Sequence, residues 1–367
     1  MNSSTDSYWM KRCLVLARSA WAATAPNPLV GCIVLDAQGK KVGQGYHHKA
    51  GLPHAEVLAL REAGKKARGG SLYVSLEPCF HQGRTPACAP QVLASGVSRV
   101  IIATQDPNPK VAGQSIAWLR EQGIEVVAGI EEEKAQQLNE VFFHRLQSTK
   151  PFVHSKIALS NDGYMGHRSK RLVLTGSSAQ RHTMKLRARY QAILTGIGTV
   201  LTDNPQMTVR GINISYQPIR MLVDSHLRCP EDALILNPKL GKSMLFCLSS
   251  YATSKKASKI RDLGVQIIGL NKALKGGLDL PQLMKALHEI NIDSLLLEAG
   301  PRLTQAFWDT DLVNRQSVYL SPIELSQHHD KKDLLEGPSP PFQAEIQSAI
   351  RMGRDLRVQI HPGSFTR

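Results

Sequence analysis

Cysteine is scarce in this chain. The 367 residues include six cysteines, namely Cys13, Cys32, Cys79, Cys88, Cys229 and Cys247. A fold held together by disulfides needs a much denser set, so that class of protein is excluded. In a reducing compartment a close cysteine pair is more often a metal or catalytic pair, whereas scattered cysteines behave as small buried hydrophobic side chains. The pair formed by Cys79 and Cys88 is therefore the one that points to chemistry.

Long apolar runs are also missing. No apolar stretch approaches the roughly 18 residues that a membrane-spanning helix needs. Arg18 interrupts the apolar segment near the N-terminus, where Trp9, Cys13 and Ala17 recur at helical spacing. We therefore predict an amphipathic first helix in place of a signal peptide, a cytoplasmic location and no membrane partner. Neither an internal repeat nor a low-complexity segment is found.

Acidic residues are outnumbered, since the net charge is +15. Residues 1–148 hold 16 Lys and Arg against 12 Asp and Glu, and the remainder holds 29 against 18, so the surplus is spread along the second half. Such a surface could bind nucleic acid, or it could favour phosphorylated small molecules. We favour the second reading, because no basic tract is concentrated in one place.

The length and the alternation of apolar segments predict two α/β domains, at 1–147 and 148–367. After the first helix, the first domain should run strand, strand, helix, strand, helix, strand, helix, strand, and end in a charged helix at 131–146. Its strands are predicted at 29–35, 41–47, 71–78, 97–104 and 125–129, and its helices at 54–64, 88–96 and 115–123. In the second domain we predict strands at 152–160, 192–198, 219–225, 243–249 and 265–270, helices at 179–190 and 280–291, and a strand, turn and helix at 293–309.

A candidate metal site lies in the first domain. The segment "HAEVLAL" starts a predicted helix at His54, and "EPCFHQGRTPAC" supplies Cys79 and Cys88. One imidazole and two thiolates form a ligand set suited to zinc, and three protein ligands leave a fourth position open for water, as in catalytic sites. Helix N-termini favour anionic ligands, which supports the thiolate form of Cys88.

Glu56 completes a catalytic pattern. It follows His54 by two residues and is not needed as a ligand, so in the first turn it can point toward the zinc-bound water and move protons. H-x-E followed by P-C and a second cysteine is the signature of zinc nucleobase deaminases, although the cysteines there are usually separated by two residues and here by eight. The alternative is a capped helix with two buried cysteines.

The whole chain resembles the bifunctional deaminase/reductase family of riboflavin biosynthesis. The resemblance rests on "PNPLVGCIVLD", "GYHHKAGLPHAEVLAL", "YVSLEPCFHQGRTPAC", "QDPNPKVAG", "AILTGIGTVLTDNPQMTVR", "VDS" and "EAGP". It implies an N-terminal cytidine-deaminase-like three-layer α/β/α domain and a C-terminal dihydrofolate-reductase-like α/β domain. The first would deaminate 2,5-diamino-6-ribosylamino-4(3H)-pyrimidinone 5′-phosphate with one Zn²⁺ per chain. The second would use NADPH to reduce the ribosyl group to a ribityl chain.

The same resemblance implies further site residues. The substrate contacts would be Asn27, His47, His81, Arg84, Arg187, Met207, Arg210 and Glu298. The cofactor contacts would be Leu159, Val173, Thr199, Asp203, Ser225, Gly300, Pro301, Arg302, Leu303, Thr304, Gln305 and Ala306. The segment from Gly300 to Ala306 also carries a signal of its own. "EAGPRLTQA" places a Gly-Pro turn before a helix N-terminus, where a phosphate can bind. We expect the chain to bind a phosphorylated pyrimidine and not nucleic acid. We also expect it to form a homodimer or homotetramer.

The second half departs from this family in places. After residues 160–163 the loop is shorter, Arg171 stands where a substrate-contacting serine is expected, and Val173 stands where a tryptophan is expected. Segment 312–326 lacks the expected acidic pair and glycine. Two rival hypotheses follow: a tRNA deaminase, which the positive charge would suit, and a zinc protein whose reductase half has decayed.

Overall fold

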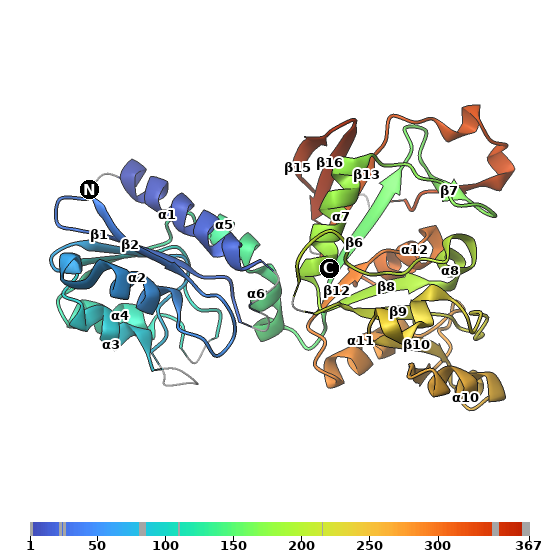
Figure 1. Cartoon of the computed structure of the whole chain (residues 1–367), viewed down its shortest axis with the longest axis horizontal. Coiled ribbons are helices and arrows are strands. Elements are labelled where there is room, and N and C mark those ends of the chain that lie inside the picture. The colour runs from blue at the N-terminus through green and yellow to red at the C-terminus, as the bar shows by residue number, and fades with distance from the viewer. Residues whose placement is uncertain are drawn as a thin grey trace. The chain divides into compact units, whose positions relative to one another are not determined.

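The computed structural model describes residues 3–21, 24, 27–80, 86–108, 111–214, 216–339 and 345–361. It divides into two compact units, Met1–Ser148 and Thr149–Arg367. Each unit is built on its own central sheet with helices packed against it (Figure 1). Both units are therefore α/β, which confirms the predicted fold class.

The first unit carries a five-stranded sheet in the order β2-β1-β3-β4-β5. Strand β1 is antiparallel to both β2 and β3, whereas β3, β4 and β5 run parallel. The strands are β1 (Gly31–Leu35), β2 (Lys41–Tyr46), β3 (Ser71–Val74), β4 (Arg99–Ile102) and β5 (Glu125–Ala128). The helices are α1 (Ser3–Ala17), α2 (Ala55–Ala63), α3 (Cys88–Ala94), α4 (Gln114–Glu121), α5 (Glu132–Leu138) and α6 (Glu140–Gln147). This order confirms the predicted alternation.

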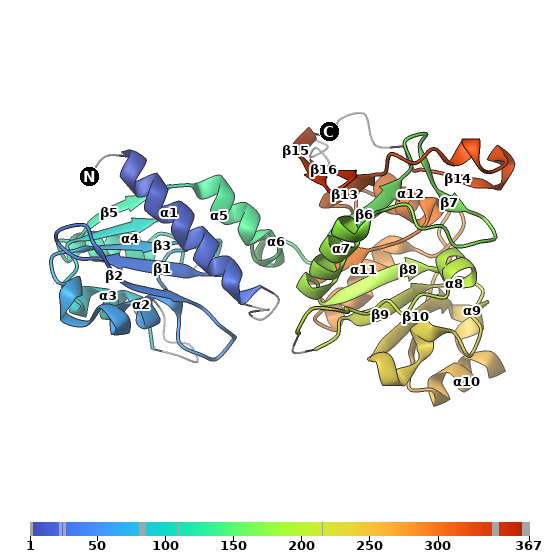
Figure 2. The same cartoon turned by 45° about the horizontal axis from the view of Figure 1, so that its top comes forward.

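Alternating side chains of this sheet form two apolar layers. Cys32 and Val34 of β1 belong to the cluster that packs against α2, α3 and α4. Ile33 and Leu35, which point the other way because strand side chains alternate, belong to the cluster that packs against α1 and α5. Figure 2 shows α1 and α5 on one side of the sheet and α2 and α3 on the other. The first unit is thus a three-layer α/β/α structure.

Two glycines in β2 bring α2 close to the sheet. A Cβ atom on Gly43 would lie 2.2 Å from the carbonyl oxygen of Ala59, and one on Gly45 would lie 2.5 Å from that of Ala55. Both contacts are with helix backbone, which cannot move aside as a flexible side chain could. Glycine at these positions therefore sets the distance between β2 and the helix that begins after His54.

The charged C-terminal segment differs from its prediction, because the continuous helix expected at 131–146 is two helices that meet at Asn139. The side chain of Asn139 is buried and bonds to the backbone of Leu29, accepting from its N–H at 2.8 Å and donating to its carbonyl at 2.9 Å. The break thus comes from a tertiary contact that the local pattern does not encode.

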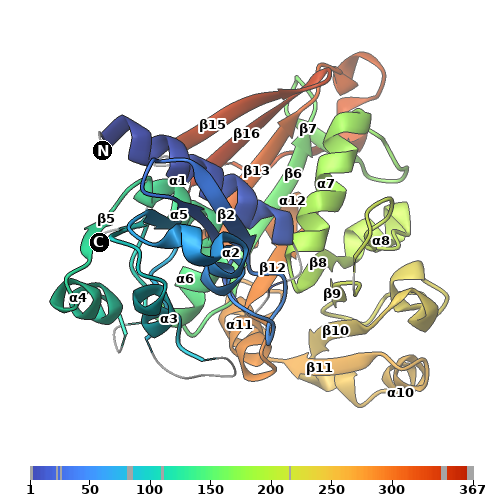
Figure 3. The same ribbon diagram turned by 60° about the vertical axis from the view of Figure 1, so that its left-hand side comes forward.

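The second unit has a nine-stranded sheet in the order β11-β10-β9-β8-β12-β6-β13-β16-β15 (Figure 3). A small two-stranded sheet pairs β14 with β7. The run from β11 to β13 is parallel, and β16 and β15 are antiparallel. Its strands are β6 (Phe152–Leu159), β7 (Tyr164–His167), β8 (Ala192–Gly196), β9 (Ile219–Val223), β10 (Ser243–Leu248), β11 (Gln266–Leu270), β12 (Ser294–Leu297), β13 (Arg315–Leu320), β14 (Leu334–Glu336), β15 (Glu345–Met352) and β16 (Asp355–His361). Its helices are α7 (Ser177–Arg189), α8 (Ile197–Asp203), α9 (Ser249–Ala252), α10 (Lys255–Asp262), α11 (Leu280–Glu289) and α12 (Pro301–Asp309).

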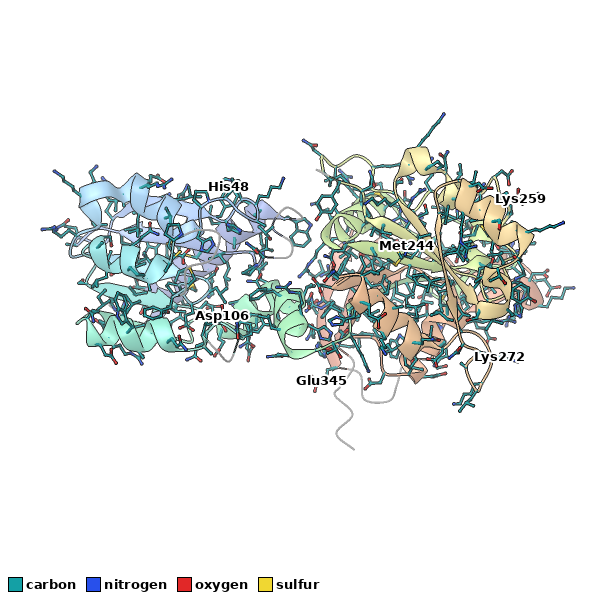
Figure 4. All side chains as sticks on the ribbon, turned by 90° about the horizontal axis from the view of Figure 1, so that it is seen from below. His48, Asp106, Met244, Lys259, Lys272 and Glu345 are labelled. Atoms are coloured by element: carbon teal, nitrogen blue, oxygen red, sulfur yellow. The ribbon has the colours of Figure 1, made fainter. Side chains whose placement is uncertain are left out.

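The two faces of the large sheet differ in character. One face is apolar and packs against α11 and α12 through a cluster that includes Met244, Leu295 and Phe307. In Figure 4 Met244 lies among the strands, whereas Lys259 and Lys272 extend outward from the periphery. The other face, in its β12-β6-β13 portion, carries polar side chains that meet α7, and it belongs to the site described below. Within the described residues, no helix combines the length and the apolar character that crossing a membrane requires.

Candidate functional site

The predicted metal ligands come together in the first unit. The ligand atoms of His54, Cys79 and Cys88 all lie within 4.8 Å of one another. The Nδ1 atom of His54 is 3.2 Å from Sγ of Cys88 and 3.5 Å from Sγ of Cys79. In the part of the chain that the structure describes, this is the cluster of three such side chains that could hold a metal ion.

Helix ends place these three residues. His54 is the N-cap of α2, and Cys88 is the first residue of α3. Cys79 follows β3, and its carbonyl accepts hydrogen bonds from the N–H groups of Cys88 and Ala89 at 3.0 and 3.1 Å. The N–H of Cys88 also points at Sγ of Cys79, 3.3 Å away. The first turn of α3 therefore fixes the position of Cys79 and supports a negative charge there.

The donor set fits zinc. One imidazole nitrogen and two sulfurs are ligands that zinc prefers, and three protein ligands are typical of a site that keeps a position for water. The proximity of the two thiols lowers the pKa of Cys79, because its thiolate accepts a hydrogen bond from Cys88, and raises the pKa of Cys88. A metal ion binds the thiolate form of cysteine, so a site that favours the thiolate loses less free energy to deprotonation when the ion binds.

Glu56 lies beside the ligands and is almost completely buried. Its Oε2 atom has no hydrogen-bond partner among the described residues. Burial raises the pKa of Glu56 to about 7. Burying a carboxyl oxygen without a hydrogen-bond partner costs free energy, which makes this position a candidate functional one. A group that titrates near neutrality can both accept and donate a proton.

Asn27 and His47 line the same region. The ring of His47 meets that of His54 edge to face, with centroids 5.3 Å apart. The Nδ1–H of His47 donates to the carbonyl of Pro53 at 3.3 Å, which leaves Nε2 to accept from the side-chain amide of Asn27 at 3.1 Å. Burial lowers the pKa of His47, so the ring is neutral and its orientation is fixed by both contacts.

The second unit gathers its candidate residues at one edge of the large sheet. Strands β9, β8, β12 and β6 are adjacent and parallel, so their carboxyl ends lie together. Ser225 follows β9, α8 with Thr199 and Asp203 follows β8, the segment from Glu298 to Ala306 follows β12, and Leu159 ends β6. Figure 1 shows α8 and α12 at this end of the sheet. A Cβ on Gly300 would lie 3.9 Å from Oγ1 of Thr199, so the turns after β8 and β12 are in contact.

A buried ion pair lies at the same edge. The guanidinium of Arg187 on α7 donates to both carboxylate oxygens of Glu298, at 2.6 and 3.0 Å, and to the carbonyl of Thr208 at 2.9 Å. It also approaches the sulfur of Met207 at 4.0 Å. Burial alone would raise the pKa of Glu298, but the charge of Arg187 outweighs it and the pKa is lowered.

Comparison with known proteins identifies the family. Residues 151–356 match the family model described as the RibD C-terminal domain, and residues 3–104 match that of the cytidine and deoxycytidylate deaminase zinc-binding region. The chain is 40% identical over 361 residues to riboflavin biosynthesis protein RibD of Aquifex aeolicus (strain VF5), covering 96% of this chain and 97% of the relative. The chain belongs to the RibD family.

Other RibD proteins extend this similarity. RibD of Escherichia coli (strain K12) is 39% identical over 331 residues, covering 86% of this chain and 88% of the relative. The solved structure of Acinetobacter baumannii RibD, form 1, superimposes with a TM-score of 0.82 at 33% identity, covering 98% of this chain and 99% of that one. A structure from Thermotoga maritima, described as a diaminohydroxyphosphoribosylaminopyrimidine deaminase/5-amino-6-(5-phosphoribosylamino)uracil reductase, gives a TM-score of 0.82 at 29% identity with the same coverage. The predicted family is confirmed, and so is its pairing of a zinc-binding deaminase domain with a reductase domain.

Several predicted site residues lie outside the described residues, are exposed, or contact other parts of the second unit. His81 and Arg84 fall outside the described residues. Arg210 is exposed and bonds to Gln206, and Val173 is 57% exposed in the loop before α7. Within α12, Leu303 and Ala306 pack against the apolar cluster, Gln305 accepts from the N–H of Ser339, and Arg302 is exposed. Thr304 is buried and its hydroxyl donates to Ala299, so Gly300, Pro301 and the first turn remain to meet a ligand.

Two residues near the sites were missed from the sequence. The carboxylate of Glu77 is buried and accepts from the N–H groups of Asp106, Gly113 and Ser115 and from the hydroxyl of Ser115, at 2.9 to 3.2 Å. It fastens the loop after β4 to the segment that carries Cys79. Lys156 in β6 was missed because a lysine in an apolar strand carries no local signal. Burial lowers the pKa of Lys156, with Glu298 and Arg187 acting on it in opposite directions.

The altered loop of the second unit lies near α8. The carbonyl of Arg168 accepts from the hydroxyl of Thr202 at 3.3 Å. Burial raises the pKa of Asp203, and the positive charge of Arg171 counteracts this. The residue that departs from the family pattern therefore sits within electrostatic reach of a predicted cofactor contact.

Proposed function

We propose that this chain is a bifunctional enzyme of riboflavin biosynthesis. Its first unit would deaminate 2,5-diamino-6-ribosylamino-4(3H)-pyrimidinone 5′-phosphate, and its second would reduce the ribosyl group of the product to a ribityl chain. The observation that carries the proposal is the convergence of His54, Cys79 and Cys88 beside the buried carboxyl of Glu56. The Thermotoga maritima relative, described as a deaminase/reductase, supports both halves.

In the deamination, zinc supplies a Lewis acid and lowers the pKa of coordinated water when bound. His54, Cys79 and Cys88 would hold the ion. Glu56 takes a proton from the attacking water and returns it to the departing amine, which leaves as ammonia. The buried setting holds its pKa near neutrality, as this double role requires. Asn27 and His47 would line the pocket for the pyrimidine.

In the reduction, NADPH supplies the hydride when bound. The bond between C1′ and the ring oxygen of the ribose breaks, a C–H bond forms at C1′, and the ring oxygen needs a proton to become a hydroxyl. Lys156 of β6 lies within electrostatic reach of Glu298 and would contact the substrate there, and water is the source of that proton. Glu298, held by Arg187, would orient the sugar hydroxyls. The turn at Gly300 and Pro301 would face a phosphate of the cofactor.

We further propose NADPH as the cofactor, a cytoplasmic location and a homodimer or homotetramer. The match to the RibD C-terminal domain supports the reductase cofactor. All six cysteines lie within the described residues and are free thiols, which suits a reducing compartment. Sedimentation equilibrium on the purified chain would measure the assembly directly.

The test uses the full chain and separates the two reactions by product mass. With the diaminopyrimidinone phosphate alone we expect release of one ammonia and a product heavier by one mass unit, and with NADPH a further gain of two mass units. Loss of the first step on zinc removal, with recovery on zinc addition, is expected. A deaminated product that NADPH never reduces would instead favour the decayed reductase, and deamination of tRNA in place of the mononucleotide would overturn the assignment.

Glu56→Gln provides the matched control. The amide has the same shape but cannot accept and return the proton, so we expect ammonia release to fall by about 10²–10⁴-fold. Zinc content, measured by elemental analysis, should stay at one ion per chain, since Glu56 is not a ligand. Substantial ammonia release by this variant would refute the role of Glu56.

A further inference from the structure

The break between α5 and α6 carries a buried side chain that does not serve its own helix. Asn139 ends α5 and is the N-cap of α6. Asparagine at an N-cap usually accepts a hydrogen bond from an N–H of the first turn, but the side chain of Asn139 makes no such bond. It accepts from the N–H of Leu29 at 2.8 Å and donates to the carbonyl of Leu29 at 2.9 Å, across 110 positions of sequence. The amide of Asn139 therefore fixes the backbone of a distant segment.

The segment that Asn139 holds leads into β1. The side chain of Leu29 packs against the apolar cluster beneath α1 and α5. The carbonyl of Val30, the next residue, accepts from the N–H of His47 at 2.9 Å. Asn139 therefore extends the fixed part of the backbone from the sheet to Leu29, which lies two residues after Asn27.

The chain between Leu29 and Asn27 is stiff. The ring of Pro28 fixes its φ angle, and a residue that precedes a proline is confined largely to extended backbone. Asn27 also donates its N–H to the carbonyl of Thr24 at 2.8 Å. A displacement of the Leu29 backbone is therefore passed on to Asn27, because few of the intervening dihedral angles can absorb it.

The side chain of Asn27 has one end engaged and the other available. Its Nδ2 atom donates to Nε2 of His47 at 3.1 Å, and within the described residues its Oδ1 atom makes no hydrogen bond. Because the amide is planar, the contact with His47 sets the direction of Oδ1. A carbonyl oxygen at this place in the pocket can accept from an N–H or amino group of a pyrimidine.

We propose that Asn139 is a positioning residue for the deamination: through the backbone of Leu29 it holds Asn27 where the Oδ1 atom accepts a hydrogen bond from the pyrimidine. The inference rests on the proposed deaminase function. Within the described residues, the side-chain hydrogen bonds of Asn139 go to Leu29 and not to a zinc ligand. Asn139 therefore affects the reaction through the segment that carries Asn27.

A double-mutant cycle on the full chain tests this coupling. Asn139→Ala removes both bonds to Leu29, and we expect it to lower kcat/KM for deamination of the diaminopyrimidinone phosphate by about 10–100-fold, mainly through KM. In an Asn27→Ala background the same substitution should change kcat/KM by less than about twofold, because the side chain that Asn139 positions is already gone. Equal losses in the two backgrounds would overturn the proposal.

A second variant, Asn139→Asp, covers the case in which Asn139→Ala fails to fold. Aspartate is a good N-cap for α6 and can still accept from the N–H of Leu29, but its second oxygen would face the carbonyl to which the amide donates. We expect KM to rise in this variant too. Hydrogen exchange at the amide of Leu29 should accelerate more in Asn139→Ala than in Asn139→Asp, and unchanged exchange in both variants would refute the clamp.

Asp6→Asn is the matched control for lost stability. Asp6 on α1 is buried in the same unit and accepts from Arg99 and from the hydroxyl of Tyr73 at 2.8 to 2.9 Å. This variant should lower the unfolding midpoint of the first unit and leave both KM and the zinc content unchanged. An equal rise of KM in Asp6→Asn would show that Asn139 acts through stability alone and would contradict the inference. A wild type that releases no ammonia from this substrate would instead overturn the proposed function, and the inference with it.

Discussion

The carboxylate of Glu298 illustrates how a single residue can serve both stability and chemistry. Its two oxygens are engaged by one guanidinium, and both side chains are about one-tenth exposed. Removing one partner of a buried pair leaves the other charge without compensation. We therefore expect Glu298→Gln to lower the free energy of unfolding of the second unit by about 3 kcal/mol. Urea denaturation measures this change, and a loss below about 1 kcal/mol would show that Arg187 finds another partner.

The pH dependence of the same pair has a definite sign. The folded-state pKa of Glu298 is lowered, so the pair stabilises the folded state at pH values above the ordinary pKa of glutamate, about 4.3. That stabilisation is lost as the pH falls through the lowered value. Unfolding free energies measured from pH 7 to pH 3 should therefore fall more steeply for the wild type than for Glu298→Gln. Parallel curves would contradict this linkage.

Glu77 allows a prediction about the loop after β4. Both of its oxygens face hydrogen-bond donors, so the amide nitrogen of Glu77→Gln would meet N–H groups and leave at least one pair of bonds unmade. We expect a loss of about 2 kcal/mol in stability. Hydrogen exchange of the amides of Asp106, Gly113 and Ser115 should accelerate, while the zinc content stays at one ion per chain. Unchanged exchange at these amides would rule out the fastening role.

At the scale of elements, the contact between β2 and α2 controls the position of His54. A methyl group at Gly45 would collide with the first turn of α2, so we expect Gly45→Ala to cost about 1–3 kcal/mol and to weaken zinc binding about tenfold. Gly43→Ala is the matched control, because its clash falls one turn farther from His54. It should lose similar stability with a smaller loss of zinc affinity. Competition with a chromogenic chelator measures the affinity, and equal zinc losses in the two variants would count against this mechanism.

The sequence was most informative where chemistry is local. Apolar runs between turn residues predicted the strands of the first unit, and the ligand types at His54, Cys79 and Cys88 indicated zinc before any distance was known. Elements that depend on distant partners were missed. Asn139 interrupts a helix because of Leu29, and β7 pairs with β14, which lies far away in the sequence. The segment 192–198, predicted as a strand entering a turn, ends at Gly196 because α8 begins there.

The second site shows the same limit. A lysine inside the largely apolar strand β6 gives no local sign of its role, so Lys156 was not recognised from the sequence. Arg187 and Glu298 were named through the family resemblance alone, although 111 positions separate them. Their pairing becomes visible only when α7 is seen against the end of β12.

For the whole molecule, the two units have separate cores and the zinc ligands belong to the first. We expect calorimetry of the full chain to show that chelation lowers the transition of the first unit and leaves that of the second in place. Zinc at about 100 times its dissociation constant contributes about 2.7 kcal/mol, a shift of roughly 5–11 °C for a unit of this size. A common shift of both transitions would mean that the units unfold as one.

The hydrogen bonds between the carbonyl of Cys79 and the first N–H groups of α3 have an evolutionary consequence. Because both cysteines are fastened to each other's backbone, the ligand spacing in space does not depend on how many residues intervene. The segment between Cys79 and Cys88 can therefore change in length during evolution, and with it the base that is accepted, while the metal site is kept. Grafting a two-residue connection between Cys79 and Cys88 should therefore preserve metal loading and abolish recognition of the phosphorylated pyrimidine.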